Sequence, residues 1–211
     1  ARRWLVGGGR VIPVFSPCPP EAGWELIWQQ SLPKSAADQR LGGFSGMALD
    51  WPRRRLLLLS DAKRTHSLAL HWDGTVRQSL FSVQAPQLLQ GQGSQKLDGE
   101  ALVRLPGTAP HRFWMASEAR NPSKRPASLF ELKLLGSGGF AIQQQWPLPA
   151  EWQPQQGQGM RRNKGPEALV ALPGLRFLLA AEAPLQQDSS RQLRLLLAKQ
   201  QGQQMQFTPL G

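Results

Sequence analysis

Short apolar runs separated by turn-forming residues dominate the hydrophobic pattern of this chain. Residues 47–49, 56–59 and 68–70 are such runs, and each is followed within a few positions by a charged residue, a glycine or a proline. Short apolar runs bounded by turn signals predict buried β-strands, although periodicity alone does not separate them from buried helical segments. The leucine-rich run at residues 193–197 therefore leaves a helical alternative open. No run approaches the length of about 20 residues that a membrane-spanning helix requires.

One module of apolar runs and turns occurs three times along the chain. Each copy opens with a run that contains an alanine–leucine pair, and its second run ends at an acidic residue. The three alanines are Ala48, Ala101 and Ala168, which lie 53 and then 67 residues apart. This period is close to that of a four-stranded propeller blade with longer loops. The repeat therefore predicts one kind of β-unit, used three times.

Four strands are expected in each module, with glycine-containing turns between them. Trp72-Asp73-Gly74-Thr75 carries the Asp-Gly pair of a two-residue hairpin turn. The expected strands are residues 46–50, 55–60, 67–72 and 75–83 in the first module, 100–105, 112–117, 127–135 and 140–146 in the second, and 167–172, 175–181, 192–199 and 203–208 in the third.

The predicted fold is all-β, a β-propeller-like array of about three four-stranded blades in a single domain, residues 1–211. The expected blades are residues 42–83, 96–147 and 162–211. Three blades form an incomplete ring, so we expect a homo-oligomer or further blades to cover the open edges.

Three other segments complete the predicted layout. We interpret residues 1–23 as a tail or a degenerate export signal, and residues 24–30 as an extra strand. Two stretches, 84–95 and 152–159, are predicted to be low-complexity loops between modules.

The composition narrows the candidate functions. There are 25 Lys and Arg against 14 Asp and Glu, a formal net charge of +11, which favours anionic partners. Nucleic acid ranks last among these, because no recognised nucleic-acid-binding module is present. The single cysteine, Cys18, excludes an internal disulfide. There is no phosphate-binding glycine loop, and Ser45 lacks the glycine spacing of a nucleophile elbow.

Acidic residues stand where the first strand of a module begins and where the second ends. Those two places lie at the same edge of an antiparallel hairpin, and first strands line the channel of a propeller. Up to six carboxylates would then gather at one channel mouth, where they would repel one another unless they bound a cation such as Ca²⁺. An equally weighted alternative is that each acid clasps a blade by bonding a backbone N–H or an arginine. These residues are Asp61, Asp98, Glu100, Glu118, Glu167 and Glu182.

Basic residues adjoin these acids in the sequence and suit a phosphate ester, because arginine binds phosphoryl oxygens in bidentate geometry. They are Lys63, Arg64, Arg120, Lys124, Arg161, Arg162 and Lys164, with Asn121 and Asn163 as neutral ligands. We interpret Arg53-Arg54-Arg55, in a predicted hairpin turn, as a solvated positive surface. The three histidines, His66, His71 and His111, show no metal-ligand spacing.

Three motifs in this order resemble the phytase-like family with "esterase-like activity of phytase". They are Gly43-Phe44-Ser45-Gly46-Met47-Ala48-Leu49-Asp50, Asp98-Gly99-Glu100-Ala101 and Asn163-Lys164-Gly165-Pro166-Glu167-Ala168-Leu169, each followed by a run that ends in an acid. The resemblance implies a β-propeller, phosphoester hydrolysis and a periplasmic or secreted location. It marks Asp61, Asp98, Glu100, Glu118, Asn163, Glu167 and Glu182 as functional. Met47 departs from the pattern, because it stands where the later modules have Glu100 and Glu167.

The leading hypothesis is therefore a calcium-assisted phosphoester hydrolase that acts on a phosphorylated small molecule. All six acids are the predicted metal ligands, and Glu100, Glu118, Glu167 and Glu182 are the predicted catalytic residues. The predicted substrate-binding residues are Arg120, Lys124, Asn163 and Lys164. The alternative is a non-catalytic propeller module that binds a protein or a polyanion.

Overall fold

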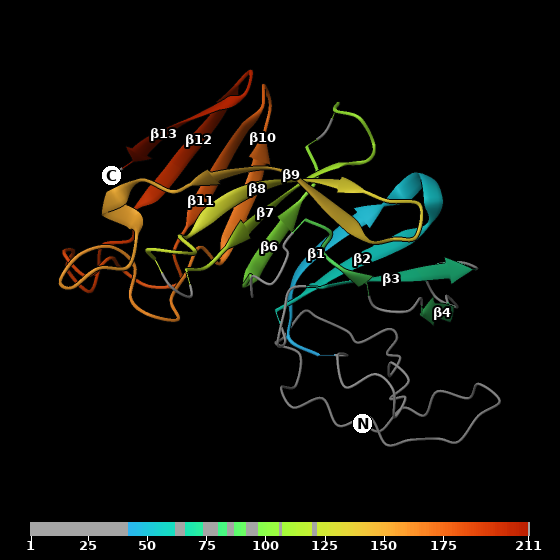
Figure 1. The fold of residues 1–211 in the computed structure, drawn as a ribbon, viewed down its shortest axis with the longest axis horizontal. Helices are drawn as coiled ribbons and strands as arrows, with labels where there is room; N and C mark the ends of the chain where they lie inside the picture. The colour runs from blue at the N-terminus through green and yellow to red at the C-terminus, as the bar shows by residue number, and fades with distance from the viewer. Residues whose placement is uncertain are drawn as a thin grey trace, which may run out of the picture.

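Three antiparallel sheets stand side by side in the structure, a computed structural model (Figure 1). It describes residues 42–61, 66–73, 80–83, 87–91, 97–105, 107–119 and 122–210. The predicted tail, the expected strand at residues 24–30, Cys18 and the Asp73-Gly74 turn lie wholly or partly outside these residues. Nothing that the structure describes includes a helix long and apolar enough to cross a membrane.

Within each sheet the strands follow one another in chain order. The first sheet contains β1 (Phe44–Asp50), β2 (Arg55–Ser60), β3 (His66–Asp73) and β4 (Leu80–Val83), and the short β5 (Gln87–Leu88) pairs with β3. The second contains β6 (Gly99–Val103), β7 (Arg112–Ser117), β8 (Ser128–Leu134) and β9 (Phe140–Pro147). The third contains β10 (Ala168–Leu172), β11 (Arg176–Ala180), β12 (Leu195–Gln201) and β13 (Gln204–Leu210).

The all-β prediction is confirmed, and the helical alternative for the leucine-rich runs is wrong. Residues 56–59 lie within β2, and most of the run at 193–197 lies in β12. That strand begins at Leu195 rather than at residue 192, because the backbone N–H of Gln192 bonds the carbonyl of Ser189 and closes a turn. The helical elements among the described residues are two 3-10 turns, η1 (Trp51–Arg53) and η2 (Ala150–Trp152).

The first strands of the three sheets are neighbours, with β6 in contact with both β1 and β10. The middle sheet is buried on both faces, as β7 illustrates. Phe113 and Met115 belong to the hydrophobic core shared with the first sheet, whereas Trp114 and Ala116 belong to the core shared with the third. Side chains alternate between faces along a strand, so a continuously apolar strand contributes to two cores. This arrangement is consistent with an incomplete propeller-like array.

Arg55 contradicts one prediction. It lies in β2 with 3% of its surface exposed, and its Nε and Nη2 donate to Asp50 Oδ2 at 3.0 and 2.6 Å. The register explains this placement, because Arg55 and Asp50 are cross-strand partners in β1 and β2. Only Arg53 and Arg54, in the turn between these strands, are exposed as expected.

The stretch predicted to be a low-complexity loop at residues 152–159 is a packed structure. The Trp152 side chain is fully buried in the core between the second and third sheets. The Gln153 amide bonds the N–H and the carbonyl of Ala127 and also the carbonyl of Leu148. Polar composition did not reveal this order, because the ordering bonds come from side-chain amides and not from an apolar face.

Candidate functional site

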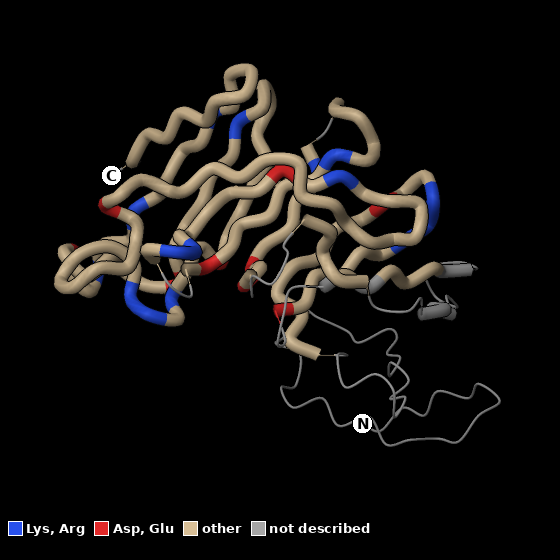
Figure 2. The backbone as a smooth tube through the Cα atoms, viewed as in Figure 1, with Lys and Arg blue, Asp and Glu red and all other residues tan. Residues whose placement is uncertain are grey.

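The acidic residues reach one edge of the molecule through the same backbone bond in every sheet. In each sheet the acidic residue one or two positions after the second strand donates its N–H to a carbonyl one to three positions before the first strand. These bonds are Asp61 N to Gly43 O at 2.9 Å, Glu118 N to Asp98 O at 2.8 Å and Glu182 N to Gly165 O at 3.0 Å. Figure 2 shows acidic positions close together at the lower ends of the central strands.

These bonds align the three modules and correct the position of Met47. The register between the first two strands shifts at Ser45 in the first sheet and at Glu100 in the second. A β-bulge of this kind leaves one residue unpaired and turns its side chain away from the regular alternation. Ser45 therefore occupies the place of Glu100, and Met47 lies two residues further along β1. The similar residues around Ala48 and Ala101 had suggested an alignment that places Met47, and not Ser45, opposite Glu100.

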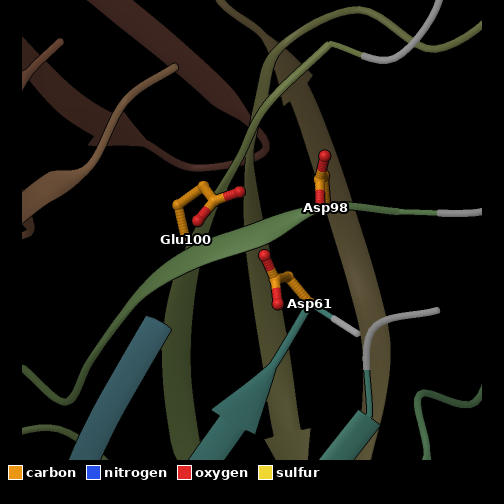
Figure 3. A group of neighbouring side chains, drawn as sticks. All are labelled: Asp61, Asp98 and Glu100. Carbon is orange, nitrogen blue, oxygen red and sulfur yellow. The ribbon is translucent and has the colours of Figure 1, made fainter. Parts of the chain in front are cut away.

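Three carboxylates from two sheets form a compact group, which we call the carboxylate cluster: Asp61, Asp98 and Glu100 (Figure 3). One oxygen from each lies within 4.8 Å of the others. Asp61 follows β2, whereas Asp98 and Glu100 come from the start of β6. Asp98 and Glu100 are buried, and Asp61 is half-buried. The cluster thus exists only because the first and second sheets pack together.

The electrostatics of this cluster favour an added positive charge. The pKa of Glu100 is raised from 4.5 to about 8, first by burial and then by the nearby charges of Glu167, Asp98 and Asp61, in that order. The opposing effect comes from a hydrogen bond with the Ser45 side chain, which lowers the pKa of Glu100. Among the residues that the structure describes, no lysine or arginine contributes to that lowering. A buried carboxylate without a compensating cation is costly to ionise.

Glu167 and Glu182 extend the acidic region toward the third sheet. Partial burial raises the pKa of Glu167, and the charge of Glu182 raises it further, while Lys164 lowers it. The charges of Asp61 and Asp98 also raise this pKa, so Glu167 interacts electrostatically with the carboxylate cluster. Lys164 forms an ion pair with Glu182 through its Nζ.

Glu118 is buried, and its side chain packs against Gly165. A Cβ built on Gly165 would lie 2.7 Å from Glu118 Cβ and 2.8 Å from its Cγ, so Gly165 covers the base of this side chain. Its carboxylate is not among the three that meet in the carboxylate cluster. Charge interactions therefore connect Glu167 with Glu182 and with the carboxylate cluster, whereas the position of Glu118 is shown by its contact with Gly165.

The predicted phosphate-binding residues do not gather in one place among the residues that the structure describes. Arg120 lies outside the described residues, as do Lys63, Arg64 and Asn121. Lys124 is exposed in a turn, and Lys164 is paired with Glu182. Asn163 has a left-handed backbone, with φ of 55°, and lines a cavity.

That cavity, which we call the groove, has a volume of about 570 Å³ and shares Asp98 with the carboxylate cluster. Its wall includes residues that the sequence did not single out as a site, since only their tertiary packing brings them together. The lining residues are Asp98, Ala119, Pro122, Pro154, Gln155, Gln156, Arg162, Asn163 and Gln186. One indication of this site was present in the sequence, the pair Arg161 and Arg162 before the third module, but it did not show which of the two lines the groove.

Comparison with known proteins identifies one family. The model of the phytase-like family, described as "esterase-like activity of phytase", matches residues 39–209. No curated protein and no solved structure matches the chain.

Proposed function

The chain belongs to the phytase-like family, and from this premise we propose that it is a calcium-assisted phosphoester hydrolase acting at the carboxylate cluster. One observation carries the proposal. Asp61, Asp98 and Glu100 bring carboxylate oxygens within 4.8 Å of one another, and no basic side chain among the described residues offsets the raised pKa of Glu100. Such a group favours its ionised form when it shares a cation.

The donor set fits a hard divalent cation. All three side chains of the carboxylate cluster offer oxygen, which Ca²⁺ prefers, and they come from two separate segments that can supply ligands from different sides. We propose that Asp61, Asp98 and Glu100 hold the ion. When bound, Ca²⁺ would polarise a phosphoryl oxygen and lower the pKa of an attached water molecule.

Glu167 is the proposed general base. Its carboxyl is exposed at the edge of the acidic region, and its raised pKa moves it toward the neutral range in which proton transfer is efficient. It would take a proton from water as the water oxygen attacks phosphorus. The bond between phosphorus and the ester oxygen then breaks, and that oxygen takes up a proton from solvent water, so that the alcohol and inorganic phosphate leave. Glu182 holds Lys164 in place, and Glu118 supports the packing around Gly165.

The test is hydrolysis of a chromogenic aryl phosphate with and without Ca²⁺. We expect the wild-type chain to lose activity in EDTA, and Glu100→Gln and Asp98→Asn to lower kcat/KM by about 100-fold or more, since each removes a ligand charge. Glu151→Gln is a matched control, because it removes one carboxylate charge outside the cluster and the groove.

A non-catalytic binding module remains the second candidate, supported by the net charge of +11. In that case no phosphate ester would be hydrolysed whichever metal ion is added, and Glu100→Gln would leave the affinity for a polyanion unchanged. Activity that is insensitive to both EDTA and the cluster variants would contradict the proposed hydrolytic site. The periplasmic or secreted location stays a prediction.

A further inference from the structure

The groove beside the carboxylate cluster has the size and the lining of a small-molecule site. Its volume of about 570 Å³ falls within the range of roughly 300–1,000 Å³ that such sites occupy. It is bounded by segments around the second and third sheets: Asp98 before β6, Ala119 and Pro122 after β7, and Arg162 and Asn163 before β10. Because Asp98 belongs to both, a ligand held at the cluster would extend directly into the groove.

One wall of the groove is rigid, and side-chain amides make it so. We call residues 153–160 the amide loop. Gln186 Nε2 donates to the carbonyls of Gln155 and Gln158 at 2.8 Å and of Met160 at 3.1 Å. Gly159, with φ of 75°, packs so closely that a Cβ there would lie 1.9 Å from the carbonyl oxygen of Gln153. A wall that is ordered before binding loses little conformational entropy when a ligand arrives.

Arg162 supplies the positive charge of the groove. The backbone N–H of Lys164 bonds the carbonyl of Arg161 at 3.1 Å, so Arg162 and Asn163 occupy the tip of a closed turn. Lys164 is occupied by Glu182, whereas Arg162 is exposed and forms no ion pair or hydrogen bond with the part of the chain that the structure describes. The guanidinium is thus the cation that the groove offers to an anionic ligand.

The other residues that line the groove indicate which chemical group is attached to the anionic part of the ligand. Gln156 is exposed, and its side-chain amide bonds no other described residue. It stands near Asn163 and Gln155, so the wall presents amides that donate and accept hydrogen bonds. In the described part of the chain, no aromatic side chain on which a ring could stack lines the groove. This chemistry suits a polar, uncharged alcohol better than an aryl group or a nucleobase.

We propose that the groove is the substrate-binding site, in which Arg162 binds the phosphoryl group and the amide loop binds a polar, uncharged alcohol. This inference rests on the proposed function and adds two specificity-determining parts to it. The phosphoryl group lies between Arg162 and the carboxylate cluster. Two of its oxygens accept hydrogen bonds from the guanidinium, and the alcohol points toward Gln156.

The first test measures binding and needs no turnover. Inorganic phosphate is titrated by calorimetry into the calcium-loaded chain, and binding of Ca²⁺ is measured separately. We expect Arg162→Gln to weaken phosphate binding about 10- to 100-fold and to leave calcium binding unchanged, as the loss of a charge-assisted bidentate contact requires. Arg162→Lys should recover part of the affinity, and Arg161→Gln, whose side chain does not line the groove, should behave as wild type.

The second test addresses the alcohol. With glycerol 2-phosphate, Arg162→Gln should lower kcat/KM, because the guanidinium holds the phosphoryl group on which charge develops in the transition state, and Gln156→Leu should raise KM about 3- to 10-fold. With an aryl phosphate, Gln156→Leu should have little effect.

These measurements separate the two levels of the proposal. Unchanged phosphate affinity in Arg162→Gln, or equal effects of Gln156→Leu on both esters, overturns the groove assignment even when the chain is a calcium-dependent hydrolase. Phosphate binding that depends on Arg162 without any hydrolysis overturns the proposed function and leaves the phosphoryl site standing. Absence of phosphate binding in the calcium-loaded wild type overturns the groove assignment.

Discussion

At the scale of single residues, the defining feature is the contrast between two buried carboxylates. Asp50 lies in the same sheet as Asp61, but it is paired with Arg55 across β1 and β2. Glu100 is buried among other carboxylates, and none of the described arginines and lysines lowers its pKa. A paired acid stabilises the fold, whereas an unpaired acid among like charges costs stability when it ionises. This difference agrees with a structural role for Asp50 and with the ligand-binding role that we propose for Glu100.

The pKa of Glu100 leads to a prediction about stability in EDTA. The unfolded chain loses this proton near pH 4.5, and the folded chain keeps it up to about pH 8. The folded state therefore binds more protons between these values, and the free energy of unfolding falls as the pH rises through them. Glu100→Gln removes this loss and should raise Tm at pH 8 by about 2–4 °C, which corresponds to about 1 kcal/mol in a chain of this size.

The measurement is thermal unfolding of both chains in EDTA at several pH values. The two Tm values should agree at about pH 3, below both pKa values, where Glu100 is protonated in the folded and in the unfolded state. Glu151→Gln serves as the control for loss of one negative charge. A parallel pH dependence of wild type and Glu100→Gln would refute the assignment of this titration.

At the scale of elements, the amide loop is held by side chains rather than by strand pairing. Gln153 and Gln186 together supply six hydrogen bonds to backbone groups. Loops usually have few internal hydrogen bonds and open easily. The six hydrogen bonds from Gln153 and Gln186 should therefore keep the amide loop in one conformation.

Gln186→Leu should loosen this loop without unfolding the sheets. It removes the donor that three carbonyls share, at a cost of about 1–3 kcal/mol. Amide hydrogen exchange should become faster in residues 155–160 and stay unchanged in β7 and β8. Gln192→Leu, at an exposed glutamine, is the matched control. Equal protection of the loop in both variants would show that Gln186 does not hold it.

At the scale of the whole molecule, the candidate site depends on how neighbouring sheets pack. Asp61 belongs to the first sheet, and Asp98 and Glu100 belong to the second. Gly46 shows how close this packing is, because a Cβ there would lie 3.0 Å from the Cβ of Leu102. The outer sheets expose apolar residues such as Met47 and Val170. Their coverage by further blades or a second copy of the chain stays a prediction.

A cation bound between two sheets should stabilise the whole array. A ligand at 100 times its Kd adds about 2.7 kcal/mol to the free energy of unfolding, so saturating Ca²⁺ should raise Tm by about 5–10 °C. Asp61→Asn should abolish most of this shift although it alters only the first sheet, and Glu151→Gln should preserve it. Differential scanning calorimetry in EDTA and in Ca²⁺ provides the comparison. An identical Tm in both solutions would exclude calcium binding at the cluster.

Much of the fold could be predicted from local patterns, because strands, turns and repeats are properties of neighbouring residues. The apolar runs of β2 and β7, and the acids at the ends of the modules, were apparent in the sequence, and the family prediction is confirmed. What the sequence could not supply was the bulge register that equates Ser45 with Glu100, the burial of Arg55, and the amide loop. These depend on hydrogen bonds and packing between segments far apart in the chain.

The amino-acid sequence by itself determined the class of fold, the threefold repetition and the acidic character of one edge, since each follows from residue type and spacing. Only the tertiary structure decided which carboxylates meet, which basic residues are already paired, and where Arg162 faces a groove. The physical reason is distance. Charge and hydrogen bonding act over a few ångströms, and only the packing of β6 between β1 and β10 brings these groups that close.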